Sequence, residues 1–149
     1  RICLVGSEMC IRDRSYTGNN RTHMIRIPDP GRFELRLMDG SANPYLLQAS
    51  VLAAGLNGLK HKINPGEPLN CNMYTDYKKY PDLPKLPNEL KESLELLRNN
   101  KEMNDAFGKE TINSYIKLRK SEINEFDNKE NFDKSKPVTQ WERQNTLDC

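Results

Sequence analysis

The chain has 149 residues, about the length of one ordinary domain, and 36% of them are hydrophobic against 30% charged. Lys and Arg number 23 and Asp and Glu 21, so the net charge of +2 excludes a bulk polycation such as a histone-like tail. No stretch approaches the roughly 18 uninterrupted apolar residues of a membrane-spanning helix, so we expect no membrane as a partner. Four scattered cysteines with no CxxC predict reduced thiols in a cytoplasmic protein, with a disulfide framework as the alternative.

An antiparallel β-hairpin is predicted in the first third of the chain. Residues 22–27 are rich in β-branched and apolar side chains, and the Pro28-Asp29-Pro30-Gly31 sequence after them is typical of a turn. Residues 32–38 alternate between apolar and charged side chains, which lie on opposite faces of a strand. One face carries Phe33, Leu35 and Leu37, and the other carries Arg32, Glu34 and Arg36.

A helix is predicted next, from its capping residue Asn43 to about residue 57, with Gly58 after its end. Pro44 suits the first turn of this helix, because a proline has no N–H to lose there. The helix is apolar nearly all round, which indicates burial on more than one side.

Further helices are predicted in the second half of the chain. Residues 69–87 hold three tyrosines among prolines and predict an ordered surface loop without a helix. Apolar residues at helical spacing then predict three helices, over residues 88–99, 101–107 and 110–128. Their inner faces are expected to carry Leu90, Leu94, Leu97, Ile112, Tyr115, Ile116, Arg119, Ile123 and Phe126. The tail, residues 129–149, is polar apart from Trp141, which we expect to hold it in place. The predicted fold class is α+β, an antiparallel hairpin followed by packed helices.

The pattern Arg32-x-Glu34-x-Arg36 puts a carboxylate between two guanidiniums on one strand face. One interpretation is a site for an anionic ligand, in which the carboxylate is free to hold Mg²⁺. The other interpretation, which spacing alone favours, is a solvent face with cross-strand salt bridges. Arg21 and Arg26 are five residues apart and fall on opposite faces of a flat strand, so they converge only if Arg21 precedes the strand. His23 has no partner ligand nearby in the sequence, which indicates a hydrogen-bonded structural histidine.

Four segments with a distinctive order and spacing are Asn20-Arg21-Thr22-His23-Met24-Ile25-Arg26-Ile27-Pro28, Arg32-Phe33-Glu34-Leu35-Arg36, Gly40-Ser41-Ala42-Asn43-Pro44-Tyr45 and Ala53-Ala54-Gly55-Leu56. Together they resemble the C-terminal catalytic region of glutamine synthetase. Near the end of the chain, Trp141-Glu142-Arg143 and Thr146-Leu147-Asp148-Cys149 resemble the bacterial type III or methylamide-forming branch of that family.

The resemblance implies an ATP-dependent ligase that forms an amide from glutamate and ammonia by way of γ-glutamyl phosphate. ATP phosphorylates the side-chain carboxylate and ammonia displaces the phosphate, and both steps gather negative charge that metals and arginines stabilise. The resemblance also implies Mg²⁺ as the metal, with Mn²⁺ as the alternative. It further implies a homo-oligomer of the ring-type dodecamer kind, located in the cytoplasm.

The same resemblance assigns roles to particular residues. Glu34 would be a metal ligand, and Arg36 would be a catalytic residue that holds the glutamate carboxylate. Arg21 would also be catalytic, and Arg21, Arg26 and Arg32 would contact the ATP phosphates. Tyr74 sits where some enterobacterial relatives are adenylylated.

The expected domain boundary lies near residue 15. Residues 1–14 do not resemble the family, and residues 5–13 resemble translated sequencing adapter, so we expect an artefact there and give Glu8 no role. Residues 15–149 are expected to form the C-terminal part of the catalytic domain. That part by itself is expected to be inactive, because it lacks the other metal ligands of the family and the N-terminal domain.

Three alternatives stay open. The first is a γ-glutamylmethylamide synthetase, or another γ-glutamyl-amine ligase on the same scaffold. The second is a non-catalytic, arginine-rich binding module for nucleic acid, although the nearly neutral charge and the lack of aromatic residues among the arginines lead us to expect no nucleic acid. The third is an interaction domain whose arginines and glutamate on the hairpin all face bulk water.

Overall fold

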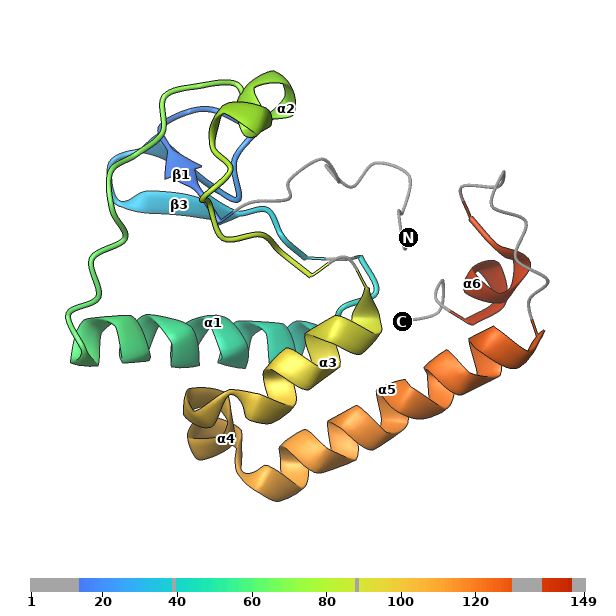
Figure 1. The fold of residues 1–149 in the computed structure, drawn as a ribbon. Coiled ribbons are helices and arrows are strands. Elements are labelled where there is room, and N and C mark those ends of the chain that lie inside the picture. Colours follow the sequence, from blue (N-terminus) through green and yellow to red (C-terminus); the bar gives the residue numbers. More distant parts are fainter. Residues whose placement is uncertain (1–13, 39, 88, 130–137, 146–149) are drawn as a thin grey trace. The chain divides into compact units, whose positions relative to one another are not determined.

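The computed structural model describes residues 14–38, 40–87, 89–129 and 138–145, and it has an α+β fold (Figure 1). The chain divides into two compact units. The described part of the first is residues 14–38, 40 and 65–87, which hold a small sheet. The described part of the second is residues 41–64, 89–129 and 138–145, which are helical. The predicted fold class is therefore confirmed.

The sheet of the first unit has three strands in the order β1-β2-β3. β2 (Ile25–Asp29) and β3 (Arg32–Leu35) form the predicted antiparallel hairpin, and Gly31 in its turn has a φ of 79°, a value that glycine adopts without strain. β1 (Tyr16–Thr17) pairs parallel to β2, and no strand was predicted there. Two residues are too few to show an alternation, so only the tertiary contact defines β1.

The segment 65–87 lies along β1 and the loop that follows it. The backbone N–H of Leu69 donates to the carbonyl of Tyr16 at 3.0 Å, and the Tyr16 hydroxyl donates to the carbonyl of Gly66 at 2.7 Å. Contrary to the prediction of a loop without helix, the segment contains α2 (Met73–Asp76) and a 3₁₀ turn (Tyr77–Lys79). Asn72 caps α2 by accepting the N–H of Tyr74, and an asparagine cap of this kind marks a helix start even when the helix is too short to show a period.

In the second unit, α1 (Pro44–Lys60) begins at its predicted cap. The Asn43 side chain accepts the N–H groups of Tyr45 and Leu46, both at 3.1 Å. The helix continues through Gly58, so its predicted end is wrong by about one turn. Its predicted burial is also wrong, because none of its residues is buried and Leu52, Leu56 and Leu59 are 67%, 66% and 78% exposed. An apolar composition indicates that a helix favours burial, but it does not identify the packing partner. Among the described elements, α1 contacts α4.

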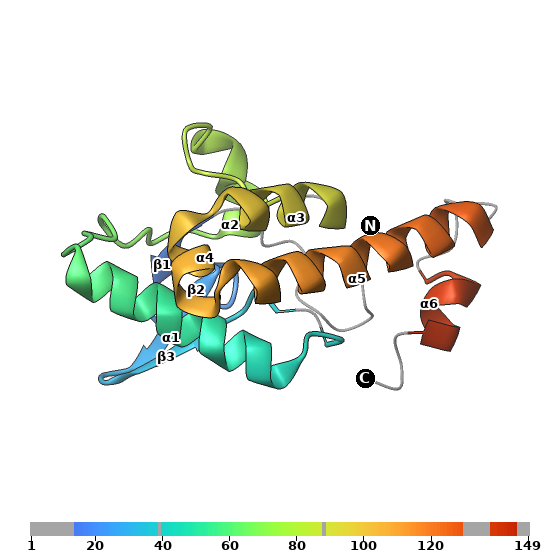
Figure 2. The same cartoon turned by 90° about the horizontal axis from the view of Figure 1, so that it is seen from below.

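The core of the helical unit lies between α3 (Leu90–Asn99) and α5 (Lys109–Lys129), which run side by side (Figure 2). Leu94, Ile112 and Ile116 are buried there, at 2%, 5% and 3% exposure, and all three were predicted on the inner faces. The other side chains packed on this core are Leu90, Leu97, Phe107, Tyr115 and Ile123. In the sequence between these two helices is α4 (Lys101–Phe107), whose bounds are those predicted and which is capped at its end by Gly108. Residue 88, the predicted first residue of α3, lies outside the described residues.

A last helix, α6 (Gln140–Asn145), was not predicted. Thr139 and Glu142 form a capping box: the Glu142 N–H donates to the Thr139 hydroxyl at 3.1 Å, and the Thr139 N–H donates to the Glu142 carboxylate at 2.6 Å. Trp141 meets Phe126 of α5 edge to face, with ring centroids 5.5 Å apart, so the predicted anchoring role of Trp141 is confirmed. Among the described residues, the helices are all too short or too polar to cross a bilayer.

Candidate active site

A β-bulge in β2 decides which side chains meet on the hairpin. The strands pair in one register next to the turn, but the register shifts further along, and Arg26 pairs with Glu34. Continuing the first register would put Arg26 opposite Leu35, on the other face of the sheet. Pro28 lies in the shifted segment, and bulges are among the few places in a sheet that tolerate a residue without an N–H. The bulge therefore turns Arg26 onto the face that carries Glu34.

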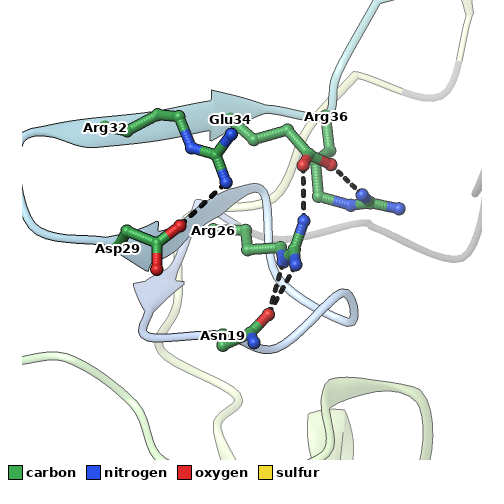
Figure 3. A network of polar contacts seen from close by, with 6 residues as sticks. All are labelled: Asn19, Arg26, Asp29, Arg32, Glu34 and Arg36. Carbon is green, nitrogen blue, oxygen red and sulfur yellow. Dashed lines mark hydrogen bonds and ion pairs between the residues drawn. The ribbon is translucent and has the colours of Figure 1, made fainter.

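Three charged side chains meet on this face (Figure 3). One oxygen of the Glu34 carboxylate accepts a hydrogen bond from Arg26 Nη1 at 2.7 Å, and the other accepts one from Arg36 Nη1. The side chains of Arg26 and Arg36 are only 15% and 9% exposed, whereas that of Glu34 is 41% exposed. Two guanidiniums and one carboxylate leave a net charge of +1, held largely out of water, which suits the binding of an anion.

Asn19, in the loop between β1 and β2, completes the network. Its side-chain oxygen accepts from Arg26 Nε at 2.9 Å and from Arg26 Nη2 at 2.5 Å (Figure 3). The same residue lines an open cleft of about 610 Å³ in the first unit, together with Thr17, Gly18, Asn20, Arg21, Pro68 and Asn70. The cleft therefore adjoins the network through Asn19.

The structure does not bring all five predicted site residues together. Arg26, Glu34 and Arg36 form the network, but Arg32 pairs with Asp29 at 2.9 Å beside the hairpin turn, where both side chains are about two thirds exposed. Arg21 precedes β2 and lines the cleft instead. Glu34 thus forms a cross-strand ion pair with Arg26, whereas Arg32 pairs with Asp29, which lies directly opposite it. The role of Arg32 stays a prediction.

The loop that carries Arg21 is fixed by the side chains of its neighbours Asn20, Thr22 and His23. The Asn20 side chain accepts from the N–H and hydroxyl of Thr22 and donates to the carbonyl of Cys71 at 2.9 Å. His23 is fully buried, with its ring nitrogens 2.7 Å from the Ser15 hydroxyl and 2.9 Å from the Cys71 carbonyl. The prediction of a structural histidine is confirmed, although His23 lies in a loop and not in a strand. In the sequence, the pattern Asn20-x-Thr22 followed by His23 is the feature that could have indicated this fixed loop.

Two interactions on the segment 71–80 shift pKa values. A hydrogen bond with the Cys71 thiol raises the pKa of the Tyr80 hydroxyl above its ordinary value. Asp76 and Lys79 form an ion pair at 2.8 Å, and their hydrogen bond lowers the pKa of the Asp76 carboxyl and raises the pKa of the Lys79 ammonium. Cys71 is a free thiol, as the prediction of reduced cysteines required of it.

Glu34 by itself does not make a metal site. Magnesium takes six oxygen ligands and is commonly held by one or two carboxylates together with phosphate oxygens and water. Within the described parts of the chain, no group of three or more His, Cys, Asp and Glu side chains lies together, and both oxygens of Glu34 already face guanidiniums. Glu34 fits as one ligand of such an ion, which takes further oxygen ligands besides it.

The α+β fold agrees with the family that the sequence resembles. The family model of the glutamine synthetase catalytic domain matches residues 7–145, and the chain belongs to this family. The match begins within residues 1–14, where we expected no resemblance. The boundary at residue 15 stays a prediction, because residues 1–13 lie outside the described part.

Several relatives are similar to the chain. Glutamine synthetase of Rhizobium meliloti (strain 1021) is 46% identical over 134 residues, which are 90% of this chain and 29% of the relative. Glutamate–methylamine ligase of Methyloversatilis universalis is 39% identical over 114 residues, which are 74% of this chain and 25% of the relative. A solved structure described as GmaS without ligand has a TM-score of 0.73 at 38% identity, over 95% of this chain and 31% of that chain. The chain therefore spans between 25% and 31% of the length of these relatives.

Proposed function

We propose that the whole protein is an ATP-dependent ligase that joins a small amine to the side-chain carboxylate of glutamate by way of γ-glutamyl phosphate. The observation that carries the proposal is the network of Arg26, Glu34 and Arg36, in a chain of the glutamine synthetase family. A similar solved structure is described as GmaS in complex with ADP, at 37% identity, which supports a nucleotide as a ligand of the scaffold.

The chemistry that such a ligase must manage is the gathering of negative charge. A glutamate carboxylate has to approach the terminal phosphate of ATP, and these anions repel each other until cations screen them. Arg36 is held by Glu34 at 9% exposure, and we assign it to the glutamate carboxylate that is being activated. Arg26 and Arg21 are assigned to the phosphates, with Arg21 reaching them from the cleft. A carboxylate oxygen attacks the terminal phosphorus and ADP leaves. The amine then attacks the acyl carbon, and phosphate leaves with that oxygen.

The proposed roles of Arg32 and Glu34 depend on further events, which are the release of Arg32 from Asp29 and the binding of a metal ion by Glu34. Arg32 would contact the phosphates only after leaving Asp29, and its two-thirds exposure permits that movement. Glu34 is proposed as one ligand of Mg²⁺, or of Mn²⁺ in its place, with phosphate oxygens and residues outside the described part supplying the others. When bound, the ion would neutralise phosphate charge.

Ammonia and methylamine are both candidates for the amine. Relatives named for each are similar to this chain, at 46% and 39% identity. The described residues are assigned to glutamate and to phosphate, and none of them is assigned to the amine. A ring-shaped homo-oligomer, a cytoplasmic location and the inactivity of the 149-residue chain by itself stay predictions.

The test uses the complete gene product. We would measure amide formation from glutamate with ATP and Mg²⁺, offering ammonia and methylamine in parallel, and we expect turnover with at least one of them. Arg36→Lys keeps the positive charge but loses the two-pronged donor, so it should raise KM for glutamate far more than KM for ATP. Turnover in neither amine, or an equal rise in both KM values, contradicts the proposal.

A further inference from the structure

We infer that Asn19 is a positioning residue that aims Arg26 at a nucleotide phosphate; this inference rests on the proposed function. Within the described residues, the hydrogen-bond partners of the Arg26 guanidinium are Asn19, which is uncharged, and Glu34, which is charged. Asn19 accepts from Nε and Nη2, while Glu34 accepts from Nη1. These two partners hold opposite sides of a planar, rigid group, so the guanidinium cannot turn about its last bonds without breaking a hydrogen bond.

The clamp leaves a defined set of donors free. A guanidinium has five N–H groups. Two donate to Asn19 and one to Glu34, so one N–H stays available on each of the two terminal nitrogens. A free terminal N–H of a charged guanidinium can donate a charge-assisted hydrogen bond to a phosphate oxygen.

The chemistry of the Asn19 side chain matters as much as its position. A carboxylate at this place would hold the guanidinium equally well but would cancel its charge. Glu34 already offsets one of the two arginine charges, so a second carboxylate would bring the network from +1 to zero. The amide oxygen of Asn19 orients Arg26 and leaves that net positive charge available to an anion.

The backbone around Asn19 is fixed without help from its side chain. The carbonyl of Gly18 accepts the N–H of Asn20 at 2.8 Å and the N–H of Ile27 at 3.2 Å, so the residues on either side of Asn19 are tied to each other and to β2. Asn19 itself is exposed and lines the cleft. Its side chain therefore contributes little to packing, and its main observed contacts are the two bonds to Arg26.

The experiment compares three variants of the complete gene product: Asn19→Ala, Asn19→Asp and Asn128→Ala. Asn128 is an exposed residue of α5 and serves as the matched control. Asn19→Ala should raise KM for ATP and weaken ATP binding in equilibrium dialysis by about tenfold, with KM for glutamate within about twofold of wild type. Asn19→Asp keeps the clamp but cancels charge, so its loss of ATP affinity should shrink as salt is added, whereas the loss in Asn19→Ala should not.

Each outcome separates the inference from the proposed function. An Asn19→Ala variant that binds ATP as the Asn128→Ala control does overturns the inference. So does an equal rise in both KM values with a lowered melting temperature, because that result indicates a structural role only. A wild-type protein that binds ATP but forms no amide overturns the proposed function, and the dialysis comparison then still decides the role of Asn19. A wild-type protein that binds no ATP overturns both.

Discussion

Replacing Glu34 by glutamine should loosen the hairpin, and the structure gives the size of the effect. The substitution keeps the shape of the side chain but turns one acceptor into a donor that faces a guanidinium. Arg26 and Arg36, at 15% and 9% exposure, then lose their shared counter-ion and lie close together as two like charges.

The magnitude follows from how far the network is shielded from water. Removing one partner of a fully buried ion pair costs about 3–5 kcal/mol, whereas an exposed pair contributes about 0–1 kcal/mol. Glu34 is 41% exposed and its partners are nearly buried, so we expect a cost of about 2 kcal/mol in the local stability of the hairpin. The pair of Asp29 and Arg32 lies on the same hairpin at 68% and 66% exposure, and Asp29→Asn should cost no more than about 0.5 kcal/mol.

Hydrogen exchange of the backbone amides in β2 and β3 measures this difference directly. A loss of about 2 kcal/mol speeds exchange by about thirtyfold where opening is local, and Asp29→Asn should change it by less than about threefold. Added salt should narrow the gap between Glu34→Gln and wild type. Equal effects of the two substitutions, or no effect of Glu34→Gln, would refute the reasoning that links burial of the arginines to the cost of removing their partner.

The remaining predictions concern the core, a thiol and a helix cap. Leu94→Ala should cost about 2–5 kcal/mol in urea unfolding followed by the fluorescence of the single tryptophan, whereas Leu96→Ala, at a position that is 51% exposed, should stay within about 0.5 kcal/mol. In a spectrophotometric titration, Cys71→Ala should let the pKa of Tyr80 fall back toward its ordinary value of 10.0. Because the pKa of Tyr80 is higher in the folded state than in the unfolded state, the neutral hydroxyl stabilises the fold at pH values below 10.0. This stabilisation is lost as the pH rises through the folded-state pKa. Wild type should therefore lose more stability than Cys71→Ala under strongly alkaline conditions. Asn43→Ala should destabilise the first turn of α1 by about 1 kcal/mol, seen as faster amide exchange there and unchanged exchange in α5.

The hairpin and four of the helices, α1, α3, α4 and α5, could be predicted because local rules fix them. Asn43 and Gly108 mark helix ends by capping chemistry that needs no tertiary contact. Leu94 and Ile112 lie on faces set by the helical period, and the structure buries both.

The candidate site could be predicted only in part, because its geometry depends on pairing across strands. Alternation along β3 puts Glu34 and Arg36 on one face, but only the bulge brings Arg26 to them. Asn19 and Arg26 are seven residues apart, and this spacing does not indicate a contact between them. The contact arises because β1 pairs parallel to β2, which brings the loop that carries Asn19 back to the Arg26 side chain. The exposure of α1 could not be predicted for a related reason. An apolar sequence indicates that a helix favours burial, but it does not identify the element that packs against the helix.

The most direct test of the ligase mechanism follows an oxygen atom from glutamate to phosphate. The complete gene product would be given glutamate labelled with ¹⁸O in its side-chain carboxylate, together with ATP, Mg²⁺ and whichever amine it accepts. If the carboxylate attacks the terminal phosphorus and the amine then displaces phosphate, each turnover transfers one labelled oxygen, and the phosphate released should carry one ¹⁸O. Unlabelled phosphate formed in step with the amide would contradict γ-glutamyl phosphate as the intermediate, and with it the roles assigned to Arg26 and Arg36.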